Sequence, residues 1–227
     1  MMVDEGLRLE FSGLRVLELE LTGLTVGKTD AGLEALKTKV TEEAKGGTRN
    51  LEAVKDEPIF RAYRDFFWKV GVDPTKTRPA GEALIRRILS GKQIPIVNTL
   101  VDAYNLVSLK TSIAIAAFDS GQLRPDALKL RKARPGERFL GIGMAQSILL
   151  EGPEVVIEDE DSHDLVAVYP YRNAEKSKVT ASTKEALLIM CGVPGIDDAP
   201  LEKARDLCKQ FISDFCTATG NPSGGSP

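Results

Sequence analysis

Three groups of polar side chains in this 227-residue chain are spaced so that they could act on a ligand. The first is a basic cluster in and just after a loop bracketed by two prolines, and its members are Lys76, Arg78, Arg86, Arg87 and Lys92. Cations beside the free N–H groups of a helix start attract anions, and phosphate is the commonest such anion. The alternative is a solvated helix face with an ion pair between Glu82 and Arg86.

A second group follows one face of an expected helix. Asn98, Asp102 and Asn105 are separated by four and then three residues, which places their side chains in one row. Amide and carboxylate groups in a row can hold hydroxyls, amines or a water molecule at fixed angles. The same spacing also describes the wet side of an amphipathic helix, and Asn98 alone is explained by helix capping.

The third group lies in the segment 169–180, which we expect to connect a strand to a helix. Glu175 could act as a base or orient a water molecule, and Arg172 and Lys178 could bind phosphate or carboxylate. The rings of Tyr169 and Tyr171 could stack on a ligand. A polar surface loop is the alternative interpretation.

The sequence gives little support for catalysis by histidine, cysteine, a metal ion or a cofactor. The single histidine, His163, lies in an acidic turn at 158–164, and three cysteines without a C-x-x-C pair favour a reducing cytoplasm. We predict no metal site, because a single histidine excludes a His-rich one. We also predict no cofactor, because the glycines at 141 and 143 lack the third glycine and the helix of a dinucleotide fingerprint. The net charge of −3 excludes a globally basic nucleic-acid coat protein, and no apolar run has the length of a membrane span.

The periodicity predicts one α+β domain with strands in the middle and helices at both ends. We expect a strand over 15–21, helices over 33–44, 50–70, 80–89 and 98–110, a strand over 113–118 and five short strands between 128 and 171. A capping box at 182–185 predicts a helix through Met190. An amphipathic helix over 201–215 is expected next, and 221–227 is expected to be a flexible tail.

Taken together, these segments resemble the B3/B4 domain of the phenylalanyl-tRNA synthetase β subunit, in the version that occurs as a freestanding protein. The motifs that carry the resemblance are FWKVGVDPTKTRP (67–79), NTLVDAYN (98–105), AAFD (116–119), FLGIG (139–143), YPYR (169–172) and KVT (178–180). They occur in the family's order between residues 60 and 207.

The resemblance implies a three-layer ββα sandwich, with an N-terminal extension over 1–57 and a motif-bearing core over 58–215 of a single domain spanning 1–220. It is similar to a proofreading site that removes tyrosine wrongly attached to the phenylalanine tRNA. By motif position, Glu175 corresponds to the editing glutamate and Asn105 to a polar residue of the editing helix. The bacterial synthetase domain has a histidine where this chain has Ala116, so the expected mechanism uses no histidine.

We therefore expect a trans-editing hydrolase that deacylates mischarged aminoacyl-tRNA in the cytoplasm, without a membrane or DNA partner. Glu175 or the terminal ribose hydroxyl would orient the water, and Asn105 and Asp102 would fix the amino acid. The remaining predicted binding residues are Asn98, Tyr171, Arg172, Lys178, Arg78 and Lys76. The alternatives are a non-catalytic tRNA-binding or RNA-binding module and a protein-interaction domain that uses the apolar face of the last helix. The oligomeric state stays open.

Overall fold

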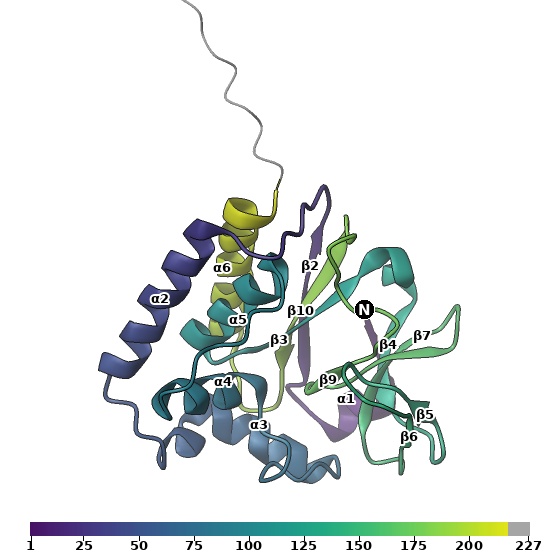
Figure 1. Ribbon diagram of the computed structural model, residues 1–227. Coiled ribbons are helices and arrows are strands. Elements are labelled where there is room, and N and C mark those ends of the chain that lie inside the picture. Colours follow the sequence, from purple (N-terminus) through teal and green to yellow (C-terminus); the bar gives the residue numbers. More distant parts are fainter. Residues whose placement is uncertain (218–227) are drawn as a thin grey trace, which may run out of the picture.

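The chain forms three layers in the computed structural model, which describes residues 1–217 (Figure 1). A layer of helices covers one face of a three-stranded sheet with the order β2–β10–β3, and a five-stranded sheet with the order β1–β4–β7–β8–β9 lies on the other side. The predicted α+β sandwich of the ββα kind is confirmed. The tail predicted at 221–227 lies outside the described residues.

Each layer draws on both halves of the chain. The helices are α1 (Glu5–Glu10), α2 (Ala31–Gly46), α3 (Pro58–Lys69), α4 (Ala80–Leu89), α5 (Thr99–Thr111) and α6 (Asp198–Cys216). The three-stranded sheet consists of β2 (Arg15–Leu21), β10 (Ala186–Gly192) and β3 (Ala114–Asp119). The five-stranded sheet consists of β1 (Met2–Val3), β4 (Leu128–Lys132), β7 (Val155–Asp159), β8 (Asp164–Val168) and β9 (Arg172–Asn173).

The central strand β10 corrects one prediction, because 186–190 was expected to be helical. All seven residues of β10 are buried, and the strand pairs antiparallel with β2 on one edge and β3 on the other. A strand covered on both faces needs a continuous apolar run rather than an alternating one, and such a run has no period that separates strand from helix. The hydroxyl of Thr183 donates to Asp119 at 2.6 Å and accepts from the Thr180 N–H at 2.9 Å, so the expected capping box closes a turn instead.

The helix predicted over 50–70 begins only at Pro58. Residues 51–53 form turns and Val54–Asp56 a short 3₁₀ turn, and Pro58 occupies the first turn of α3. Proline favours this position because its missing N–H has no partner there in any helix. The other helices and strands occur close to their predicted bounds.

The last helix, α6, packs its apolar stripe inward. Leu201, Ala204, Cys208, Phe211 and Ile212 are buried, and the helix lies against α5 and β10. This face is therefore covered within the chain, which removes the basis of the protein-interaction alternative.

A small hairpin covers the outer face of the five-stranded sheet. β5 (Arg138–Phe139) and β6 (Ile148–Leu149) pair with each other, and Phe139 and Leu150 join Val156 and Val168 in a second small core. The first and larger core includes residues from all three layers. Because the hairpin shields the outer face, β7 is buried on both faces, and the loop that connects β5 to β6 is brought next to β9.

Two tyrosine hydroxyls attach other elements to the end of β10. Tyr63 of α3 donates to the carbonyl of Cys191 at 2.5 Å and accepts from the N–H of Ala114 at 3.0 Å. Tyr169, just after β8, donates to the carbonyl of Gly192 at 2.8 Å. Burial raises the pKa of both phenols, so both stay protonated and available as donors.

Within residues 1–217, no helix is long and apolar enough to cross a membrane, and the cytoplasmic location stays a prediction.

A buried ion pair connects α2 to α5. Lys37 Nζ lies 2.8 Å from Asp102 Oδ2 and 2.8 Å from Glu34 Oε1, and Asp102 is 1% exposed. Burial acts to lower the pKa of Lys37, but the bonds to Asp102 and Glu34 outweigh it and hold this pKa above its ordinary value. The second carboxylate oxygen accepts the N–H of Val97 at 3.0 Å. Asp102 thus has two partners that fix the start of α5.

We expect Asp102→Ala to lower the free energy of unfolding by about 3 kcal/mol, because it leaves a buried ammonium group without its main partner. Urea denaturation measures this change. The matched control is Glu43→Ala, which breaks an exposed pair with Lys110 and should cost less than about 1 kcal/mol. Equal losses for the two variants would show that the buried pair does not stabilise the layer.

Candidate functional site

The segment that carries Arg172, Glu175 and Lys178 runs from β9 toward β10, between two strands rather than into a helix. The Asn173 side chain donates to the carbonyl of Ala117 in β3 at 3.1 Å, and the N–H of Asp119 donates to the carbonyl of Ser177 at 2.9 Å. The segment is therefore attached to β3, at the junction between the two sheets.

The loop after β5 contacts this segment directly. The N–H of Glu175 donates to the carbonyl of Leu140 at 2.9 Å, and the N–H of Ile142 donates to the carbonyl of Asn173, also at 2.9 Å. The Arg172 guanidinium donates to the carbonyl of Ile142 at 3.3 Å and is exposed. The glycine-containing segment 141–143 thus packs directly against the segment that carries Arg172 and Glu175.

The charge of Glu175 is set by its neighbour on the same loop. Lys178 forms an ion pair with the Glu175 carboxylate, and this hydrogen bond lowers the pKa of Glu175 below its ordinary value, with a smaller contribution from the N–H of Gly143. Glu175 is half-buried and Lys178 is exposed. At neutral pH the carboxylate is ionised, so it can accept a proton or a hydrogen bond from a water molecule.

The Tyr171 side chain is half-buried rather than free to stack. Its ring centroid lies 5.8 Å from that of Phe67 in α3, and burial raises the pKa of its phenol. The ring therefore helps to hold the start of the segment in place. Further along the same segment, the buried Ser177 hydroxyl has no hydrogen-bond partner among the described residues, a feature that the sequence did not indicate.

The Asn98, Asp102 and Asn105 row is divided by the fold. Asn98 caps α5, accepting the N–H of Val101 at 2.9 Å, and Asp102 is bonded to Lys37 and Val97. Both side chains are buried with partners in the folded chain, whereas Asn105 is half-exposed and makes no side-chain hydrogen bond to a described residue. Asn105 is thus the member of the row with free hydrogen-bonding capacity.

β3 is the common neighbour of α5 and β9. The helix packs against this strand, β9 contacts it as well, and half-buried Ala116 lies within it. The helix α5, which carries Asn105, and the strand β9, which precedes Glu175, therefore both contact the strand that contains Ala116. The role of the predicted site residues stays a prediction.

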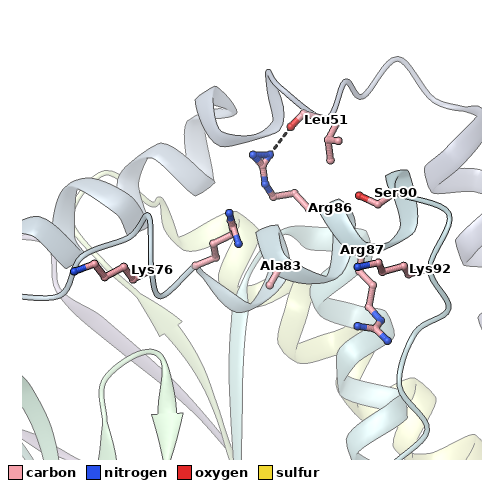
Figure 2. Close-up of a pocket in the computed structure, with 8 residues that line it drawn as sticks. Leu51, Lys76, Ala83, Arg86, Arg87, Ser90 and Lys92 are labelled. Atoms are coloured by element: carbon pink, nitrogen blue, oxygen red, sulfur yellow. Dashed lines mark hydrogen bonds between the residues drawn. The ribbon is translucent and has the colours of Figure 1, made fainter.

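The predicted basic cluster lines an open hollow of about 560 Å³ beside α4 (Figure 2). Its lining consists of Leu51, Lys76, Arg78, Ala83, Arg86, Arg87, Ser90 and Lys92. Arg86 bonds to the carbonyl of Leu51, and Arg87 donates to the carbonyl of Gln93 at 2.5 Å. The structure thus groups Lys76 and Arg78 with Arg86, Arg87 and Lys92, and Arg172 and Lys178 are not among the lining residues.

The histidine and the cysteines lie away from these groups. His163 is exposed in its acidic turn, 3.7 Å from Glu158. All three cysteines are buried, and burial raises the pKa of Cys208 to about 12 and also raises the pKa of Cys191 and Cys216. These thiols are therefore protonated at neutral pH. Residues 1–217 contain no group of three or more His, Cys, Asp or Glu side chains arranged to hold a metal ion.

We expect Gly141→Ala to displace Arg172, because a Cβ at this position would overlap Arg172 Cδ. The guanidinium should leave the carbonyl of Ile142 while the protein stays folded, since the clash is with a flexible side chain. A crystal structure of the variant would show this change. Gly46→Ala is the control, because a Cβ there meets nothing within 4 Å. An unmoved Arg172 would contradict the predicted contact.

Comparison with known proteins identifies the family. The model of the B3/4 domain matches residues 62–217. The phenylalanine–tRNA ligase beta subunit of Symbiobacterium thermophilum is 32% identical over 128 residues, which are 56% of this chain and 14% of that protein. The crystal structure of an N-terminal fragment of the phenylalanyl-tRNA synthetase beta-subunit from Pyrococcus horikoshii matches 97% of this chain and 54% of that one, with 13% identity and a TM-score of 0.46. The resemblance is confirmed, and the chain belongs to the B3/4 domain family.

Proposed function

We propose that this chain is a trans-editing hydrolase that removes a wrongly attached amino acid from a tRNA. The observation that carries the proposal is the ionised, half-buried carboxylate of Glu175, held between the loop at 141–143 and the junction of the two sheets. It lies inside the region that the family model matches. The chain spans 14% of its phenylalanine–tRNA ligase relative, so the activity of that whole enzyme is not carried over.

The reaction needs little chemical assistance, because an aminoacyl ester is already activated. A water molecule attacks the ester carbonyl carbon, the bond to the ribose oxygen breaks, and the water proton ends on that oxygen, which leaves a free amino acid and a tRNA with a free hydroxyl. Correct placement of the water and the ester can supply most of the rate enhancement. Neither histidine nor a thiolate is required for this step.

The roles of the side chains follow from their exposure and partners. Glu175 accepts a hydrogen bond from the attacking water and takes up its proton, which is then delivered to the ribose oxygen. Lys178 keeps the carboxylate ionised. The exposed guanidinium of Arg172 is oriented by the carbonyl of Ile142, which leaves further N–H groups for a phosphate of the RNA 3′ end. Asn105 provides an unused amide for the amino acid. Asn98 and Asp102 support Asn105 by fixing the start of α5.

A non-catalytic RNA-binding module is the second candidate, and Ala116 favours it. A methyl group at this position cannot exchange a proton or hydrogen-bond to a substrate. This candidate predicts RNA binding with a steep salt dependence and no deacylation. A panel of correctly and incorrectly charged tRNAs, incubated with the protein and separated on acid gels, distinguishes the two candidates.

We expect Glu175→Gln to slow deacylation of the preferred mischarged tRNA at least about a hundredfold, because the amide cannot accept the water proton. The acid-gel assay measures the rate. Glu202→Gln, which changes an exposed side chain of α6, is the control and should leave the rate unchanged. A Glu175→Gln variant as fast as the unmodified protein would remove Glu175 from the mechanism.

The pH dependence gives a second test. Because the pKa of Glu175 lies below its ordinary value of about 4.5, its carboxylate persists as the pH falls and is lost only below that value. After subtraction of spontaneous hydrolysis, the Glu175-dependent rate should stay level between about pH 5 and pH 8. A rate that falls by half near pH 6.5 would instead indicate an imidazole of ordinary pKa, which this mechanism does not use.

A further inference from the structure

The hollow beside α4 gathers several cationic side chains on one concave surface. We call it the basic hollow and define it by its lining cations, Lys76, Arg78, Arg86, Arg87 and Lys92. None of its lining residues is acidic. The cations come from the loop before α4, from α4 itself and from the segment after it, so the fold converges them on one concave surface.

One buried carboxylate, Glu82, pairs with a cation of this surface. Glu82 is 0% exposed, and it lies 3.2 Å from Arg64 NH1 and 3.4 Å from Arg86 Nε. The pair expected between Glu82 and Arg86 does form, but it lies at the buried base of α4 and is shared with a second arginine. The ion pair of the alternative interpretation is therefore present, but its carboxylate is buried rather than solvated.

The five cations differ in how firmly they are held. Arg86 and Arg87 each donate to a backbone carbonyl, which fixes their planes and leaves other N–H groups unused. Arg78 and Lys92 form no side-chain hydrogen bond or ion pair with a described residue. Lys76 has one distant partner, Asp73, at 3.9 Å. Two oriented guanidinium groups with three freer cations suit phosphate groups, since arginine binds phosphate oxygens in pairs and lysine adds charge.

We propose that the basic hollow binds the phosphate backbone of an RNA, as a contact additional to Arg172 and Lys178. The choice of RNA among phosphate esters rests on the proposed function. The shape agrees with a chain of phosphates, because the hollow is open and holds about 560 Å³. The side chain of Leu51, which is 40% exposed, lies beside the cations, and a ribose can pack against it. A free nucleotide or pyrophosphate shares the chemistry, and the experiment separates the two.

The test compares two triple variants with the same loss of three charges. Lys76→Gln, Arg78→Gln and Lys92→Gln remove the freer cations of the hollow. Lys28→Gln, Lys39→Gln and Lys209→Gln are the control, because these side chains are exposed and have no ion pair with a described residue. Far-UV circular dichroism confirms that both variants are folded. The probe is unfractionated uncharged tRNA, with affinity measured between about 50 and about 200 mM salt.

We expect the hollow variant to bind this tRNA at least about tenfold more weakly, with a salt slope about 2 units less steep, because each lost phosphate contact removes about 0.7 to 0.9 of a unit. The control should keep the slope of the unmodified protein. Equal weakening in both variants would show an effect of total charge and would overturn the proposal, as would no weakening in either. The proposal also fails if the hollow variant loses binding of inorganic pyrophosphate but keeps its affinity for tRNA.

This result is independent of hydrolysis, because uncharged tRNA has no ester to cleave. If the unmodified protein deacylates mischarged tRNA but the hollow variant binds tRNA normally, the hollow is excluded and the hydrolase proposal stands. If tRNA affinity falls as expected but the unmodified protein cleaves no member of the charged panel, the hydrolase proposal fails and the RNA-binding hollow stands.

Discussion

The structure depends on the complete burial of β10. This strand pairs on both edges and is covered on both faces, by helices on one side and by the five-stranded sheet on the other. One of its edge partners, β3, contacts both α5 and β9, so the helix with Asn105 and the segment with Glu175 take their positions from the same sheet. At the opposite end of β10, Tyr63 and Tyr169 satisfy backbone groups that would otherwise be buried without partners. The candidate site thus lies at the edge strand β3, and its geometry depends on the packing of β10 in the core.

The local sequence pattern predicted the elements that have one buried face and one exposed face. The alternation of apolar and charged residues predicted β2 with its observed bounds, and the three-to-four spacing predicted α4, because each of these elements has one wet face. The local pattern gave the wrong prediction at β10, because both faces of this strand are buried and its sequence has no alternation of apolar and polar residues. The capping box at 182–185 strengthened the error, since the partner of the Thr183 hydroxyl is Asp119, 64 residues away in the chain. A pattern within four residues contains no information about that contact.

The same distinction separates the candidate site residues. The basic hollow and the pair of Glu175 and Lys178 are formed by residues near one another in the chain, so their chemistry was visible in the sequence. The spacing of Asn98, Asp102 and Asn105 correctly placed them along one helix, but it could not show that Lys37 on α2 would bond to Asp102. The contact of the 141–143 loop with Arg172 also joins distant segments, and it is explained only by the hairpin that covers the second sheet.

The basic hollow has a consequence for how a polyanion approaches the molecule. Apart from its five cations, the chain has 25 lysines and arginines against 33 aspartates and glutamates, so the remainder is net negative. If a nucleic acid binds the basic hollow, as proposed, the cations there attract it while the net negative charge of the remainder opposes it, which favours one orientation of approach. This attraction extends over about one Debye length, roughly 8–10 Å at physiological ionic strength, and raising the ionic strength shortens it.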